Sequence, residues 1–143
     1  MIDERVTKWL IKASNDFRTA EKLLDVIADP AIRDSIAFHC QQTVEKVLKA
    51  FLTHKEVDFG RTHDVEYLAY LCAQVDSDFN WVSKEVAAFL PYAVEIRYPD
   101  EFYIPSSQEV LTLFEIARKV KEFVFSKLGV ADDDVDTMRR KLL

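Results

Sequence analysis

The chain has 143 residues, of which 49% are hydrophobic and 31% are charged, and its formal net charge is −6. This length suits one domain with a substantial core. The acidic balance argues against broad, non-specific nucleic-acid binding, which needs a dominant basic surface, but it leaves room for a local basic site. Glycine and proline are scarce and no alternating strand pattern occurs, so the sequence predicts an all-α protein.

The two cysteines, Cys40 and Cys72, stand alone within apolar helical patterns. This predicts small core residues in a reduced, cytoplasmic protein. They form neither a CxxC pair nor a zinc pattern with the three histidines, so we expect no metal site and no cofactor. The first residues lack the apolar stretch of a signal peptide, and no apolar run is long enough to cross a membrane, so no membrane partner is expected.

Apolar residues at a 4,4,3,4 spacing predict the first helix over residues 7–27; they are Trp9, Ala13, Phe17, Ala20 and Leu24. Asp16 stands at the edge of this apolar stripe. Because a carboxylate is costly to bury alone, it either has a cationic or N–H partner on another helix or is half-exposed. The short connection at residues 28–30 predicts an antiparallel hairpin with the second helix, for which Asp29 is the expected N-cap.

The second helix is predicted over residues 31–55, the longest helical pattern in the chain. Its core stripe is Ile36, Ala37, Cys40, Val44, Val47, Leu48 and Phe51. Roughly opposite lies a polar stripe, which comprises Ser35, His39, Gln42, Lys46 and Lys49. This stripe is either a solvated face or a shallow site whose imidazole, amide and ammonium groups hold a phosphate. Glu45 lies beside it, within i,i+4 reach of Lys49.

Two large apolar residues of this second helix, Phe38 and Leu52, lie away from its core stripe. A helix that is apolar on more than one side is either buried on two faces or packed against a second subunit. Together with aromatic residues near Arg97, these two side chains predict a homodimer.

A loop over residues 56–63 leads to a third helix at residues 64–75, with Thr62 as the expected N-cap. His63 is either a ligand to something at the start of that helix or a partner of a neighbouring backbone group. A fourth helix is predicted over residues 81–96, kinked or restarted at Pro91. Because Pro99 disfavours the α region for Tyr98, this helix should end there.

The proline-bounded segment after the fourth helix contains Arg97, Tyr98, Phe102 and Tyr103. It is either a platform on which a base or nucleotide stacks or a cover for the open end of a helical bundle. Ser106 or Ser107 should cap the fifth helix, which runs to residue 128 and stops at Gly129. Residues 1–129 then form the predicted bundle. Residues 130–143 form a tail that is either loosely ordered or a short helix at an interface.

Three stretches together resemble the HEPN domain family. They are the opening helix with Trp9 and Asp16, the segment FHCQQTVEKVLKA in the second helix, and the motifs THD at Thr62 and RYPD at Arg97. The resemblance implies an up-down bundle of four to five helices. It also implies a homodimer that is associated with nucleotide or RNA. In many relatives such a domain is the toxin of a toxin–antitoxin pair, with a minimal nucleotidyltransferase as its partner.

Catalytic members of this family are metal-independent ribonucleases in which an Arg is followed after four to six residues by a His. Here Phe102, Tyr103 and Ile104 occupy that window after Arg97, so the motif is incomplete. Such a nuclease needs a group that exchanges a proton with the ribose or the leaving oxygen, and a Tyr titrates too high to serve easily.

Our interpretation is therefore a nucleotide- or RNA-phosphate-binding protein that acts with a nucleotidyltransferase. His39, Gln42, Lys46 and Lys49 would hold phosphate, and Arg97 and Tyr98 would add a charge and a stacking surface. One alternative is an RNA-cleaving toxin, in which Arg97 acts with His39 or His63. A second alternative is an interaction module without a ligand.

Overall fold

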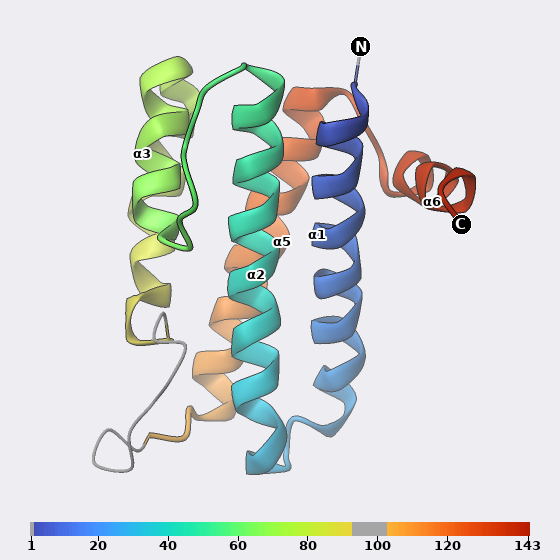
Figure 1. Ribbon diagram of the computed structural model, residues 1–143. Coiled ribbons are helices and arrows are strands. Elements are labelled where there is room, and N and C mark those ends of the chain that lie inside the picture. Colours follow the sequence, from blue (N-terminus) through green and yellow to red (C-terminus); the bar gives the residue numbers. More distant parts are fainter. Residues whose placement is uncertain (1, 93–102) are drawn as a thin grey trace.

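A computed structural model describes residues 2–92 and 103–143 of the chain (Figure 1). Its α-helices are α1 (Glu4–Leu23), α2 (Pro30–His54), α3 (Val65–Val75), α4 (Asn80–Glu85), α5 (Ser107–Leu128) and α6 (Asp132–Lys141). Short 3-10 segments cover Leu24–Val26, Ser77–Phe79 and Val86–Tyr92. The described residues contain no strand, so the predicted all-α class is confirmed.

The helices α1, α2, α3 and α5 alternate in direction and form an up-down bundle, with α2 at its centre (Figure 1). Helix α1 packs along one side of α2, α3 lies along the other side, and α5 lies behind them. The short connection after α1 makes α1 and α2 the predicted antiparallel hairpin. No helix within residues 2–92 and 103–143 has both the length and the apolar composition that crossing a membrane requires.

The central position of α2 explains why it is apolar on more than one side. From Val47 to Leu52, every residue of this helix is buried. Leu52 is fully buried within the chain, so it is not available for the subunit contact that its off-stripe position had suggested. Phe38, nearer the start of the helix, remains 53% exposed.

The helix ends follow capping chemistry, with two corrections to the predicted boundaries. Helix α1 starts earlier than expected, because the Asp3 side chain accepts a hydrogen bond from the Val6 N–H and caps it. Helix α3 is capped by Asp64 rather than Thr62, since the Asp64 carboxylate accepts from Glu66 and Tyr67. The hydroxyl of Thr62 accepts from the Asp64 N–H one step earlier in the chain.

The predicted start and stop of α5 are both confirmed. Ser106 and Glu109 form a reciprocal capping box at its start. Gly129 ends the helix in the left-handed conformation, with φ of 70°. The predicted fourth helix is shorter than expected: α4 changes to 3-10 geometry at Val86, five residues before Pro91. The rest of that predicted helix, including Arg97 and Tyr98, lies outside the described residues.

The C-terminal tail forms α6, which packs on the outer side of α1 (Figure 1). Val135 is fully buried there, and Arg18 of α1 forms an ion pair with Asp136. Arg139 donates hydrogen bonds to Ser14 Oγ at 3.0 Å and to Asn15 Oδ1 at 3.1 Å. Of the two alternatives for the tail, the structure shows the short helix, and the surface that it covers belongs to its own chain.

Candidate phosphate-binding site

Asp16 of α1 joins two residues of the predicted phosphate site. His39 Nδ1 lies 2.8 Å from Asp16 Oδ1, and Lys46 Nζ lies 2.5 Å from Asp16 Oδ2. His39 and Lys46 are two turns apart on α2, so both side chains reach the same neighbouring helix. The Asp16 side chain is 11% exposed, whereas those of His39 and Lys46 are 26% and 20% exposed. The expectation that Asp16 has a cationic partner is confirmed, and its two partners present part of their surface to solvent.

Gln42, another predicted site residue, is linked through Gln41 to the loop that precedes α3. Its Nε2 donates to Gln41 Oε1 at 2.9 Å, and Gln41 Nε2 donates to the backbone oxygen of His63 at 3.2 Å. Gln42 is half-buried and Gln41 is buried. Gln41 was not among the predicted site residues. The sequence feature that could have identified Gln41 is its position directly after the core residue Cys40, because a polar side chain that is buried there needs a hydrogen-bond partner.

Lys49, the last member of the polar stripe, is buried rather than exposed. Its Nζ lies 3.0 Å from Glu45 Oε2, and the two side chains are only 6% and 3% exposed. The same ammonium group lies 5.2 Å from the centre of the Trp9 ring and 5.7 Å from that of Phe59. The predicted i,i+4 pair is confirmed. The idea of a continuous solvent-facing stripe is wrong, because α1 and the loop after α2 cover this end of the helix.

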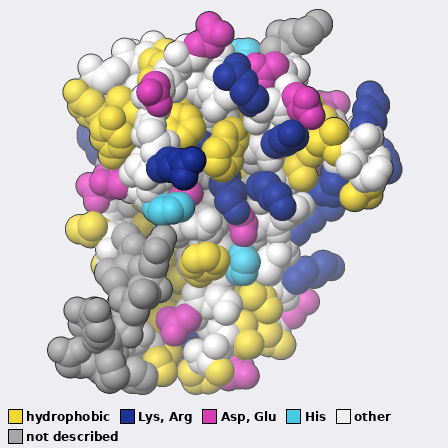
Figure 2. Space-filling model, viewed as in Figure 1, with side chains coloured by type: hydrophobic (Ala, Val, Ile, Leu, Met, Phe, Trp, Pro, Cys, Tyr) yellow, Lys and Arg dark blue, Asp and Glu magenta, His cyan; other side chains and the backbone are white. Residues whose placement is uncertain are grey.

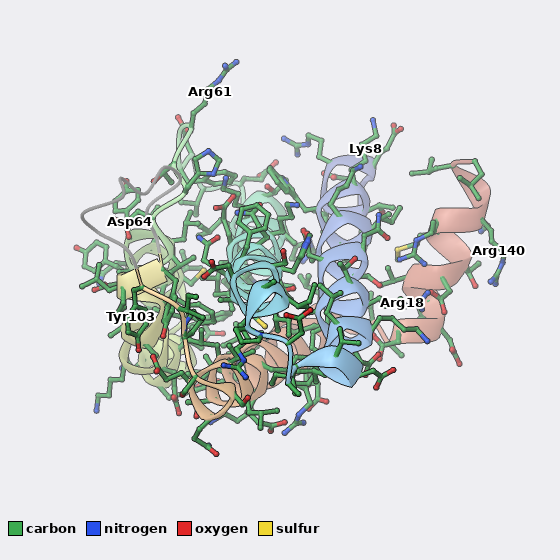
Figure 3. All side chains as sticks on the ribbon, turned by 90° about the horizontal axis from the view of Figure 1, so that it is seen from below. Lys8, Arg18, Arg61, Asp64, Tyr103 and Arg140 are labelled. Carbon is green, nitrogen blue, oxygen red and sulfur yellow. The ribbon has the colours of Figure 1, made fainter. Side chains whose placement is uncertain are left out.

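His63 lies at the other side of Glu45. Its Nδ1 is 3.1 Å from each Glu45 oxygen, and its side chain is 63% exposed. Beside it is a pocket of about 630 Å³, lined by residues 61–66 and Leu90. In Figure 3, Arg61 extends away from the bundle. His63 therefore links a buried carboxylate to an open pocket.

The structure thus brings His39 and Lys46 together through Asp16 and joins Lys49 to His63 through Glu45. Arg97 and Tyr98 lie outside the described residues, so their distance from these clusters is not part of the structure. Within residues 2–92 and 103–143, no group of three or more His, Cys, Asp or Glu is placed to hold a metal ion.

Exposed basic side chains lie on α1, the helix that carries Asp16, and on α6. Figure 2 shows Lys and Arg gathering over α1 and α6 on the face that it presents. Lys8, Lys12, Arg140 and Lys141 are exposed members of these two helices. An acidic protein therefore carries a local concentration of basic side chains on these two helices, one of which, Lys8, is paired with Glu4.

By its fold, the protein is an all-α four-helix bundle, and ion pairs join its two N-terminal helices. A family comparison then identifies the family: the HEPN domain matches residues 6–128, and the chain belongs to it. No curated protein and no solved structure matches the chain. The match ends at the last residue of α5, so α6 lies beyond the matched part.

Proposed function

We propose that this HEPN domain binds the phosphate groups of nucleotides or RNA at the Asp16 cluster. Membership of the family supports a nucleotide- or RNA-related role. The observation that carries the proposal is the convergence of the half-buried His39 and Lys46 side chains on Asp16. Donors held in place by a carboxylate lose little conformational entropy when they bind an anion.

In this proposal the predicted residues have unequal roles. Lys46 and His39 donate directly to phosphate oxygens, and the Gln42 amide adds a neutral donor. Lys49 acts indirectly, because it is buried and holds Glu45, which in turn contacts His63. Arg97 supplies a guanidinium fork and Tyr98 a stacking surface.

The test is binding of a labelled single-stranded RNA and of free nucleotides as a function of salt. Lys46→Gln and His39→Gln should each weaken binding at least about tenfold, and Lys46→Gln should reduce the salt dependence by about one counterion. Arg97→Lys, which keeps the charge but loses the fork, should also cost about tenfold. Lys84→Gln on exposed α4 is the matched control. Unchanged binding by Lys46→Gln contradicts the proposal.

We also propose that the domain acts as a homodimer with a minimal nucleotidyltransferase, as in a toxin–antitoxin pair. The support is the HEPN resemblance and the exposed apolar side chains of Phe38 and Leu90, which are 53% and 65% exposed. Light scattering at micromolar concentration tests the dimer, and co-purification with the products of neighbouring genes tests the partner. A monomer contradicts the proposed dimer, and recovery of no nucleotidyltransferase contradicts the proposed partner.

One observation favours RNA cleavage as a second candidate function. If His39 Nδ1–H donates to Asp16, the Nε2 atom carries a lone pair and can accept a proton, as a general base must. His63 has the same relation to Glu45. Metal-free protein that cleaves RNA, and loses cleavage in Arg97→Lys and in His39→Gln or His63→Gln, selects this function. Asp16→Asn should then lower the rate without abolishing RNA binding.

A further inference from the structure

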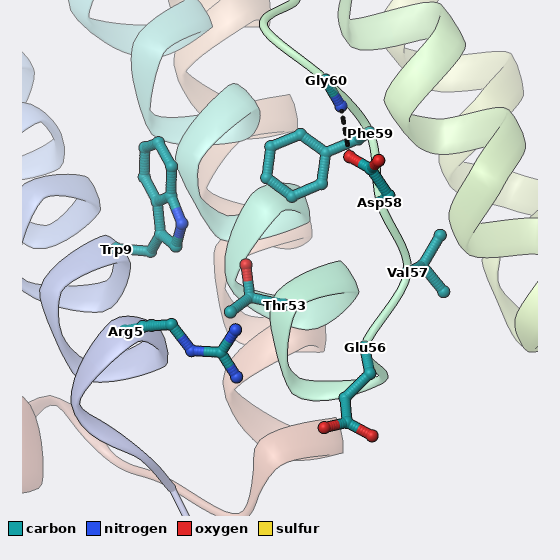
Figure 4. A pocket seen from close by; sticks show the side chains of 8 residues that line it. All are labelled: Arg5, Trp9, Thr53, Glu56, Val57, Asp58, Phe59 and Gly60. Atoms are coloured by element: carbon teal, nitrogen blue, oxygen red, sulfur yellow. Dashed lines mark hydrogen bonds between the residues drawn. The ribbon is translucent and has the colours of Figure 1, made fainter.

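A second pocket, distinct from the one beside His63, is lined by Trp9 and Phe59, the two aromatic residues that Lys49 contacts. It has a volume of about 450 Å³, within the usual range of small-molecule sites, which is about 300–1,000 Å³. Helix α1 contributes Arg5 and Trp9, α2 contributes Thr53, and the loop over residues 56–60 closes the remaining side (Figure 4). None of its lining residues belongs to the phosphate site described above.

The walls of this pocket are aromatic. The Trp9 and Phe59 rings stand edge-to-face with their centres 6.4 Å apart, and both are half-buried. Lys49 Nζ lies near both rings and fixes them from the interior. Because the two ring planes are inclined by 62°, a planar ligand stacks on one ring and presents its edge to the other. Such surfaces bind nucleobases of any sequence.

Charged groups of both signs line the pocket. Arg5 is 67% exposed and uses one nitrogen to bind Asp3 at 2.9 Å, which leaves further N–H donors. Glu56 is near enough to contribute to a raised pKa of Arg5, after the larger effect of Asp3. One oxygen of Asp58 accepts from the Gly60 N–H at 3.0 Å. Within the described residues, the Glu56 carboxylate forms no hydrogen bond or ion pair.

This combination selects one kind of ligand. A simple anion would meet the carboxylates of Glu56 and Asp58, and a simple cation would meet Arg5. A neutral planar ring with donors and acceptors along its edge satisfies all of them. Guanine has the O6 and N7 acceptors that Arg binds bidentately, and next to them N–H donors that a carboxylate accepts.

The backbone at Glu56 supports a role beyond folding. It is the non-glycine residue with positive φ in the described chain, with a value of 57°. Glycine, asparagine or aspartate adopts this conformation at lower cost than glutamate does. In this conformation Glu56 places its carboxylate at the edge of the pocket.

We propose that this pocket binds the guanine base of a nucleotide. The base stacks on Trp9 with its edge toward Phe59, Arg5 donates to its O6 and N7, and Glu56 accepts from its ring and exocyclic N–H groups. The inference extends the proposed function by naming a base and a place for it. Its test is separate, because it uses residues that the phosphate site does not.

The protein carries its own probe for this test. Trp9 and Trp81 are its two tryptophans, and Trp81 lies on α4 against Phe123, away from the pocket. In Trp81→Phe, the remaining fluorescence reports Trp9. Guanosine monophosphate should quench it saturably, and adenosine monophosphate should bind at least about tenfold more weakly. Calorimetry provides a second readout that is independent of nucleotide absorbance.

Matched variants complete the experiment. Glu56→Gln and Arg5→Gln should each weaken binding of guanosine monophosphate at least about tenfold. Their controls are Glu115→Gln and Arg118→Gln, which change a surface ion pair on α5 and should leave binding unchanged. Absent quenching, equal binding of both nucleotides, or equal losses in variants and controls overturns the proposal. If Lys46→Gln loses RNA binding while guanosine monophosphate still quenches Trp9, the phosphate site and the guanine pocket act independently, and both proposals are supported.

Discussion

Lys49 Nζ lies 3.0 Å from Glu45 Oε2 one turn back on α2, in a part of the bundle where both side chains are less than a tenth exposed. The ammonium group also faces the Trp9 and Phe59 rings, and the carboxylate also accepts from His63. A charge in such surroundings depends on its partner, because burial removes the water that would otherwise solvate it. The pair therefore couples the stability of α2 to the loop over residues 56–63. This loop lines both the pocket beside His63 and the pocket beside Trp9.

Replacing Lys49 should test this coupling. Lys49→Met should lower the free energy of unfolding by about 3–5 kcal/mol, because the buried Glu45 carboxylate then loses the ammonium group that compensates its charge. The double change Glu45→Gln with Lys49→Met should recover part of that loss, since no unpaired charge remains. Urea denaturation measures both. Lys12→Met on the exposed face of α1 is the control and should change stability by less than about 0.5 kcal/mol; an equal loss there would contradict a specific role for the buried pair.

Local sequence signals predicted most of the fold. Apolar spacing predicted α1, α2, α3 and α5, and capping chemistry predicted the start of α5 at Ser106 or Ser107 and its end at Gly129. These features depend on neighbours within a few residues, which the sequence shows directly. Thr62 and Asp64 are both suitable N-cap residues for α3. The sequence alone does not show which of their side-chain oxygens accepts from the free N–H groups at the start of this helix.

The candidate site was harder to predict, because its geometry depends on which helices cover α2. A helical wheel separates Lys49 from the core stripe, but α1 and the loop with Phe59 bury that side as well. The wheel therefore identified the polar residues and misjudged the exposure of one. The partner of Asp16 could be expected in kind but not in identity, since the pairing of His39 and Lys46 with it depends on the register between α1 and α2.

Both cysteine thiols should be unreactive in the folded protein. Burial raises the pKa of Cys40 and of Cys72 from 9.0 to about 12, which leaves almost no thiolate at neutral or mildly alkaline pH. Because these folded pKa values exceed the unfolded ones, their contribution to stability is complete below pH 9 and declines as the pH rises toward 12. Ellman's reagent at pH 8 should label neither cysteine until urea unfolds the protein, when it should label both. Rapid labelling without denaturant would contradict the buried positions.

The start of α5 should depend on pH through Glu109. Its carboxylate accepts hydrogen bonds from the hydroxyls of Tyr103 and Tyr92, both at 2.5 Å, and from the Ser106 N–H, which lower the pKa of Glu109 from 4.5 to about 2. A lowered pKa stabilises the fold above pH 4.5, and that stabilisation is lost as the pH falls toward 2. Carbon-detected NMR titration should find this low value, and Tyr103→Phe should raise it. Tyr70→Phe, which removes an exposed hydroxyl from α3, should not.

Helix α6 should undock from α1 without unfolding the bundle. Val135 is fully buried at their contact, and Lys121 of α5 holds α6 through Asp132 at 2.8 Å. Val135→Asp replaces apolar burial of about 1.5–3 kcal/mol with a carboxylate that lacks a partner there, so the helix should separate. Hydrogen exchange should then accelerate across α6 while the amides of α2 and α5 stay protected. Thr137→Asp introduces the same charge at an exposed position of α6 and should leave exchange unchanged. If Val135→Asp instead accelerates exchange throughout the bundle, then α6 is part of the same cooperative unit as residues 2–129, and the predicted division at Gly129 fails.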